Sequence, residues 1–286
     1  MIKKVEEIIG SEPNISIRRL AQRLSLSDRT IRKILKEDLK MFPYKIQVHQ
    51  RLNDEAISKR YTFASDLLEM IDSKRIDPTK IIFSDEAHIW LDAYISSQNF
   101  RIWGSEKPEF VINKPLHPKR VTVWCAMTAT KIIGPSFFDS NIDSESYGKL
   151  LKDFFLPRVF DEGWNKDHFF QQDGAAPHVT RENLELLKGV FGERVFSRKY
   201  PDNFDIGIAW PPYSPDLSPL DFFLWGYLKD KIFENAPKTI ESLSEAIVEV
   251  LESVPAVSCG RTIASFEKRL RYLVTAGGGY IENIPS

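Results

Sequence analysis

The chain has few cysteines and no long apolar run. Its 286 residues include only Cys125 and Cys259, and neither lies in a paired or metal-ligand spacing, which argues against a disulfide framework and a zinc site. No run of 18 or more apolar residues occurs, and the first ten residues form a charged helix pattern. A membrane span and a signal peptide are therefore not expected. These absences predict a protein of a reducing compartment inside the cell.

A marked excess of either charge is also missing. The sequence has 39 basic and 40 acidic residues and a net charge of −1, so the overall composition says nothing about nucleic acid. The distribution is uneven, because residues 1–60 contain 14 basic and 8 acidic side chains. The N-terminal segment therefore carries an excess of positive charge, and the rest of the chain is acidic.

The N-terminal segment has the spacing of three short helices, predicted over residues 2–9, 16–24 and 28–39. Apolar residues recur at helical intervals in the second and third, and Ser27 or Asp28 can cap the third. This pattern is typical of a helix-turn-helix. The exposed face of the third helix then offers five residues to a major groove: Arg29, Thr30, Arg32, Lys33 and Lys36. Periodicity alone leaves open a generic small helical bundle with a solvated surface.

Beyond this segment the pattern changes to alternating strands and helices of the α/β class. The predicted strands cover residues 80–84, 89–95, 99–103, 120–127, 131–138, 167–172 and 208–210. The predicted helices cover residues 54–71, 144–160, 180–187, 220–233, 240–251 and 262–276. We therefore expect a helix-turn-helix domain at 1–41, a linker and bridging helix at 42–76, and an α/β catalytic domain at 77–286.

Three acids occupy special places in this pattern. Asp85 follows the first strand, Asp173 follows a later strand, and Asp221 opens a helix after the last strand. Neighbouring strand ends bring their terminal residues together, and a helix across that edge can add a third. Crowded carboxylates repel one another, and oxygen ligands select Mg²⁺ or Mn²⁺ rather than zinc. A single Asp is more often a turn or helix cap, so spacing alone does not decide.

Two hard cations close together can activate a water or a 3′-hydroxyl and stabilise the leaving oxygen of a phosphodiester. The chemistry that such a cluster of acids predicts is in-line phosphoryl transfer.

The residues around these acids resemble the three acid-bearing motifs of mariner-like transposases. The matching stretches are FSDE at 83–86, QQDGAAPH at 171–178 and WPPYSPDLSPLD at 210–221. Further resemblance covers residues 94–103, 121–127, 222–229 and the terminal GGYIE. The resemblance implies a ribonuclease H-like mixed sheet flanked by helices, preceded by a small all-α helix-turn-helix domain.

The resemblance also implies a function. It assigns Asp85, Asp173 and Asp221 as catalytic and metal-binding residues, with two Mg²⁺ or Mn²⁺ ions as cofactors. The implied activity is cut-and-paste transposition, by strand cleavage and strand transfer at terminal inverted repeats. The implied partner is double-stranded DNA, both of the repeats and of the target. The implied assembly is a homodimer. The DNA substrate implies a location in the nucleus.

The chain departs from the family pattern at two points. The family's final acid follows a Pro-Leu pair, which selects Asp221; Asp216 is then expected to cap the loop, and Asp216→Ala to have a mild effect. The 47 residues between Asp173 and Asp221 exceed the spacing typical of the family, and the extra length is expected in a surface insertion at 191–205. The family generally has two helix-turn-helix units and this chain has room for one, so the first is expected to be absent.

Other residues carry weaker predictions. Glu86 is expected to be structural, because adjacent strand side chains point to opposite faces. For His178, contact with substrate and stabilisation of the loop remain equally open. His88 and His117 lack ligand spacing. Packing is expected for the tryptophans at 90, 103, 124, 210 and 225.

Two other functions are alternatives to transposition. One is a transposon-derived DNA-binding protein without retained catalysis. The other is a related nuclease acting on RNA or a hybrid, which the motifs and the N-terminal helix disfavour.

Overall fold

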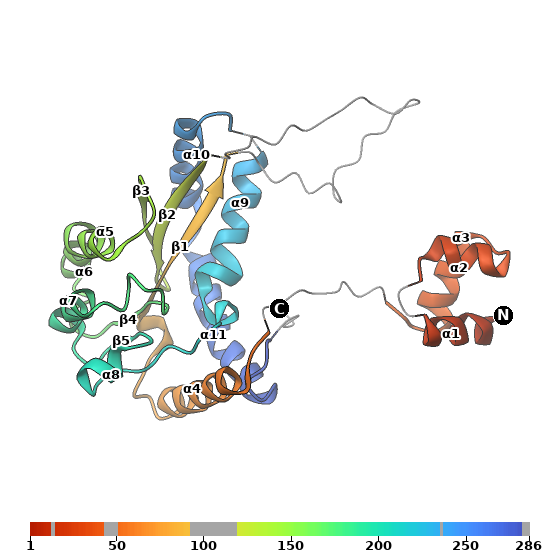
Figure 1. The fold of residues 1–286 in the computed structure, drawn as a ribbon, viewed down its shortest axis with the longest axis horizontal. Coiled ribbons are helices and arrows are strands. Elements are labelled where there is room, and N and C mark those ends of the chain that lie inside the picture. Colours follow the sequence, from red (N-terminus) through yellow and green to blue (C-terminus); the bar gives the residue numbers. More distant parts are fainter. Residues whose placement is uncertain (13–14, 43–50, 92–118, 235–236, 282–286) are drawn as a thin grey trace. The chain divides into compact units, whose positions relative to one another are not determined.

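The computed structural model describes residues 1–12, 15–42, 51–91, 119–234 and 237–281 (Figure 1). They form two compact units, Met1–Arg51 and Leu52–Ser286. Helix α4 (Asp54–Asp72) belongs to the second unit, whose core it enters. The division into functional domains at residues 41 and 76 stays a prediction. Within the described ranges, no helix combines the length and apolar composition that a bilayer crossing needs.

The first unit consists of α1 (Ile2–Ser11), α2 (Ile17–Leu24) and α3 (Asp28–Lys33), and α3 continues in the π-helical turn η1 (Ile34–Asp38). The apolar residues that recur at helical spacing meet in one small core. Its fully buried members are Val5, Leu20, Ala21, Ile31 and Ile34. The predicted three-helix pattern is confirmed.

The turn between α2 and α3 is fixed by two serines. Ser25 ends α2 in the left-handed conformation, at φ 52°. The Ser27 hydroxyl accepts a hydrogen bond from the Thr30 amide at 3.1 Å, so Ser27 rather than Asp28 caps α3. The five residues predicted to face a groove are all exposed on α3 and η1.

The second unit is built on a five-stranded sheet in the order β3-β2-β1-β4-β5. The strands are β1 (Ile81–Trp90), β2 (Arg120–Met127), β3 (Ile132–Phe138), β4 (Phe169–Gln171) and β5 (Val195–Phe196). The first three pair antiparallel, whereas β4 and β5 run parallel to β1. This is the mixed sheet that the sequence predicts.

Helices cover both faces of the sheet (Figure 1). One face packs against α5 (Ser144–Lys149), its π-helical continuation η3 (Leu150–Phe155), α6 (Leu156–Asp161) and α7 (Arg181–Phe191). The other packs against α4, η5 (Leu220–Leu224), α9 (Trp225–Glu234), α10 (Ile240–Ser253) and α11 (Ala256–Thr275). Along β1, Ile82 enters the first core and Phe83 the second, as the two-residue period of a strand requires.

The first strand is longer than predicted. The sequence suggested one strand ending before Asp85 and another beginning at Ile89, but β1 runs unbroken through both. Antiparallel pairing with β2 from Phe83 to Trp90 explains this, because β2 supplies partners along that whole length. Asp85 is therefore inside β1. The strand predicted at 99–103 lies outside the described residues.

The expectation of a surface insertion at 191–205 is wrong. This stretch contains edge strand β5 and helix α8 (Tyr200–Phe204), and Phe196 and Tyr200 are at most 1% exposed. Residues 208–210 form only an isolated bridge, from Ile208 to Phe196, instead of the predicted strand.

Candidate functional site

The sheet brings Asp85 and Asp173 to the same place. The last parallel pair between β1 and β4 joins Phe83 to Gln171, and each acid lies two residues beyond its member of that pair. Here β4 ends while β1 continues beside β2, so the two strands separate and open a cavity. Asp85, within β1, and Asp173, in the loop after β4, both line it.

Asp221 reaches the same cavity from η5, the helical turn that leads into α9. The cavity has a volume of about 1030 Å³, and all three acids line it. Trp225, four residues after Asp221, donates its indole N–H to Asp85 Oδ2 at 2.7 Å. The sequence predicted only a packing role for Trp225; its spacing from Asp221 on one helix could have indicated a role at the site.

The three acids do not share one electrostatic state. Burial raises the pKa of Asp85 well above its ordinary value, and the charges of Asp221 and Glu86 raise it further, against the Trp225 hydrogen bond. The cavity walls likewise raise the pKa of Asp221 to about 6 by desolvation, with a further contribution from Asp173. Burial alone would raise the pKa of Asp173. The hydrogen bond to His178 outweighs burial, so the pKa of Asp173 is lowered. A cation at the cavity would relieve this repulsion.

The donor set fits a hard divalent cation, because it offers carboxylate oxygens without thiols. The side chains do not converge fully, however. Within the described ranges, no group of three or more Asp, Glu, His or Cys side chains is close enough to hold a metal ion. The acids therefore share a cavity without forming a finished coordination shell.

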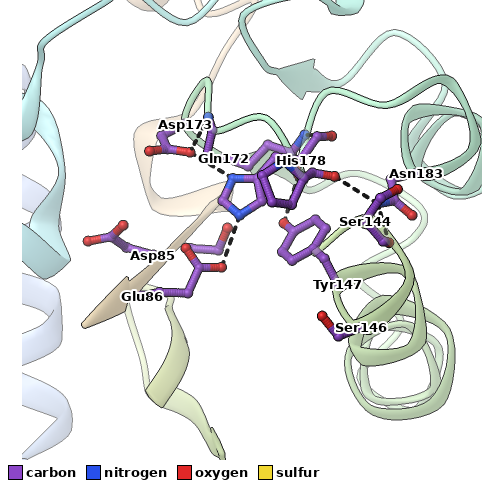
Figure 2. A network of polar contacts seen from close by, with 12 residues as sticks. Asp85, Glu86, Ser144, Ser146, Tyr147, Gln172, Asp173, His178 and Asn183 are labelled. Atoms are coloured by element: carbon purple, nitrogen blue, oxygen red, sulfur yellow. Dashed lines mark hydrogen bonds and ion pairs between the residues drawn. The ribbon is translucent and has the colours of Figure 1, made fainter. Parts of the chain in front are cut away.

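His178 connects the two acid-bearing strands (Figure 2). Its Nδ1 lies 2.7 Å from Asp173 Oδ1, and its Nε2 lies 3.1 Å from Glu86 Oε1. Burial disfavours the imidazolium, but the carboxylates of Glu86 and Asp173 outweigh burial and raise the pKa of His178 to about 10. A protonated His178 can donate to both carboxylates at once. Glu86 thus has a partner that the sequence did not predict.

A second set of polar residues fixes His178 (Figure 2). The Tyr147 ring lies against the imidazole, with centroids 4.1 Å apart, and its hydroxyl donates to Gln172 Oε1 at 2.8 Å. Gln172 in turn donates to the carbonyl of His178 and to Ser197 Oγ, each at 3.0 Å. Every member is buried, so the loop after Asp173 has little freedom.

Asp216, the other acid of the third motif, is engaged elsewhere. It accepts two hydrogen bonds from Arg60, at 2.8 and 2.5 Å. The Arg60 side chain is 0% exposed, and it also donates to the carbonyls of Tyr213 and Gly278. Among the described residues Asp216 anchors the loop to Arg60 and not through the local cap that was expected. The expectation that its loss is mild must also be revised, because a buried cation would lose its counterion.

The remaining predicted residues have local roles. His88 lies 3.0 Å from Thr122 Oγ1 across the sheet, and Trp124 is fully buried in the core. His117 and Trp103 lie outside the described residues. On α3 and η1, Lys33 lies 4.0 Å from Glu37, and the other basic residues, Arg29, Arg32 and Lys36, are also exposed.

Comparisons with known proteins point to transposases. The chain is 26% identical to the Tc3 transposase of Caenorhabditis elegans over 260 residues, 90% of this chain and 73% of the relative. It is 25% identical to human histone-lysine N-methyltransferase SETMAR over 98% of its own length, but spans only 39% of SETMAR. No family model matches the chain.

The fold is that of a solved transposase. A Mos1 transposase paired-end complex with the left transposon end superposes with a TM-score of 0.76 at 17% identity, covering 99% of this chain and 80% of Mos1. Paired-end complexes of Mos1 with Mn and with Mg give TM-scores of 0.71 and 0.72. At such low identity the likeness shows a shared fold, and the predicted mixed sheet with flanking helices is confirmed.

Proposed function

We propose that the chain is a metal-dependent DNA transposase of the mariner/Tc1 type, because it is similar to the Tc3 transposase over 90% of its length and shares the fold of Mos1. It cleaves DNA at terminal inverted repeats and transfers the strand ends to target DNA. The observation that carries the proposal is that Asp85, Asp173 and Asp221, one from each motif, line a single cavity.

Asp85, Asp173 and Asp221 would hold one or two Mg²⁺ or Mn²⁺ ions. Such ions, when bound, supply charge stabilisation for in-line phosphoryl transfer and a more acidic attacking water or hydroxyl. The protein orients the carboxylates: Trp225 fixes Asp85 and His178 fixes Asp173. Hydrogen bonds of this kind would orient the two carboxylates toward a metal ion.

DNA recognition is proposed for the exposed basic face of α3 and η1, which suits a major groove. Double-stranded DNA of the terminal repeats and of the target is the partner that this activity requires. A homodimer is the proposed assembly, because two transposon ends must be held together, and a Mos1 paired-end complex shares this fold. The DNA substrate implies a nuclear location.

Plasmid cleavage tests the proposal. A supercoiled plasmid carrying the element's terminal repeats is incubated with wild type and with Asp173→Ala, under Mg²⁺, Mn²⁺ and chelator. Cleavage by metal-loaded wild type alone is expected. Equal inertness of both proteins, with a gel shift that still reports binding, would contradict catalysis.

One observation supports DNA binding without cleavage. The three acids share a cavity, but no metal-sized group of ligands forms within the described part of the chain. A transposon-derived DNA-binding protein without retained catalysis is therefore the alternative function.

Neutralising the basic face of α3 should weaken DNA binding. We expect the double variant Arg29→Ala/Arg32→Ala to reduce the slope of log affinity against log salt by about 0.9 for each DNA phosphate that the protein no longer neutralises. Lys3→Ala/Lys4→Ala is the matched control, since these exposed residues lie on α1. Fluorescence anisotropy with a labelled duplex measures both slopes, and equal slopes for the two double variants would exclude α3 as the reading helix.

Removing the His178 imidazole should impair metal binding and cleavage together. We expect His178→Ala to lower Mn²⁺ affinity or cleavage rate by about 10- to 100-fold, because residues that orient metal ligands have effects of this size. His168→Ala is the control, since His168 contacts Asp167 and the Trp164 ring and does not line the cavity. If both variants matched wild type in a Mn²⁺ titration and in plasmid cleavage, His178 would have no orienting role.

A further inference from the structure

The cavity that holds the three acids is strongly acidic, which is unfavourable for a DNA strand. Carboxylates from several elements line it: Glu55, Asp66, Asp85, Glu86, Asp173, Asp202 and Asp221. Among the described lining residues only Lys59 and Arg198 are basic. Lys59 is already paired with Glu55, at 2.6 Å. A polyanion in this cavity would therefore need further positive charge beside it.

Among the residues that the structure describes, Arg198 has no partner, in contrast to Lys59. Within the described part of the chain its guanidinium makes no hydrogen bond and no ion pair, although the side chain is exposed and lines the cavity. It follows β5, in the stretch that the sequence suggested was a surface insertion. After the dominant effect of Lys59, the charge of Arg198 contributes to lowering the pKa of Glu55, which also lines the cavity.

The aliphatic part of Arg198 lies against Gly174, the residue that follows Asp173. A Cβ atom added to Gly174 would come within 2.5 Å of Arg198 Cδ and 3.1 Å of Arg198 Cβ. The aliphatic stem therefore packs directly on Gly174, and the guanidinium stays close to the loop that carries Asp173. A planar guanidinium with free donors matches a phosphate better than any other side chain does.

We propose that Arg198 is a phosphate-binding residue of this site, which contacts the backbone of the DNA strand entering the cavity beside Asp173. The inference deepens the proposed function, on whose DNA substrate it rests, but it does not require that the protein still cleaves DNA. It assigns a binding role to the segment between β5 and α8.

Arginine footprinting tests the contact without relying on activity. The full chain is treated with phenylglyoxal, with and without duplex DNA, in Ca²⁺ and at concentrations where a gel shift shows all protein bound. Mass spectrometry of the peptides should show Arg198 modified several-fold more slowly with DNA, and Arg158, exposed on α6 away from the cavity, unchanged. Equal modification of Arg198 in both states would overturn the proposal.

Variants test the consequence for the reaction. At saturating DNA, Arg198→Ala should lower the single-turnover cleavage rate about 10- to 100-fold, the value of one charged hydrogen-bond partner. Arg198→Lys should restore part of the rate. Lys199→Ala, which removes the adjacent exposed charge outside the cavity, should match wild type. If Arg198→Ala also matched wild type, Arg198 would have no role in the reaction. If wild type itself did not cleave, the proposed catalysis would fail, and the footprint would still decide for or against Arg198.

Discussion

Replacing any one of Asp85, Asp173 and Asp221 by alanine is expected to lower the rate of metal-dependent DNA cleavage by roughly 1000-fold or more. A bound divalent cation contributes several kcal/mol of transition-state stabilisation, and each 1.4 kcal/mol removed is about tenfold in rate. DNA binding should change little, because the basic face of α3 belongs to the other unit. Single-turnover plasmid cleavage and a gel shift on the same preparations measure the two effects.

Asp202→Ala is the matched control, because Asp202 lines the same cavity from α8 but belongs to none of the three motifs. Its cleavage rate should stay near that of wild type. Asp85→Asn should also fold normally, since burial and neighbouring charges already disfavour the charged form of Asp85. If Asp202→Ala were as inactive as Asp221→Ala, general cavity charge rather than three specific ligands would explain the loss. An active Asp221→Ala with an inactive, folded Asp216→Ala would make our choice of third acid wrong.

Arg60→Ala and Asp216→Ala are each expected to destabilise the second unit by about 3–5 kcal/mol, because either change leaves one buried member of an ion pair without its partner. At 2–4 °C per kcal/mol for a unit of this size, the melting temperature should fall by roughly 10 °C. The Arg60 side chain is 0% exposed and that of Asp216 9%. Asp216→Ala would then lose activity through unfolding, and not through loss of a metal ligand.

Thermal denaturation followed by circular dichroism checks this account. The exposed pair Arg75–Glu69, at 3.1 Å, supplies the control, and Glu69→Ala should cost at most about 1 kcal/mol. The double variant Arg60→Met/Asp216→Leu should be less destabilised than the sum of its single changes, since no buried charge is left unpaired. Additive losses would show that the two residues act independently.

The sequence predicted the structure well where the periodicity of apolar residues and the acid-bearing motifs indicated the same element. The strand segments that lead to Asp85 and Asp173 were predicted from the sequence, although β1 continues through Asp85. The register of β1 with β4 then makes their convergence a matter of sheet geometry. The three N-terminal helices were also predicted from the sequence, because their core residues recur at helical spacing within single helices.

The sequence could not reveal contacts between distant segments. The structure buries the charged Arg60 and leaves its neighbour Tyr61 44% exposed. Its partner Asp216 is 156 residues away, and no helical periodicity encodes such a pair. His178 bridges Glu86 and Asp173, and it is 92 residues away from Glu86 in the sequence. Strand β5 was not predicted, because it has only two apolar residues and lies in a polar stretch of the sequence.

The most direct test of the central claim is Mn²⁺ binding by the full chain, followed through the EPR signal of free Mn²⁺ near pH 7.5. Asp221 is mostly ionised at this pH, since its pKa is about 6. Mn²⁺ binding should weaken when the pH falls below that pKa, because metal ligands must be deprotonated. The account predicts saturable binding by wild type and by Asp202→Ala, and its loss in Asp85→Asn and Asp173→Asn. No binding by wild type, or undiminished binding by both Asn variants, would contradict the claim that the three motif acids form one metal site.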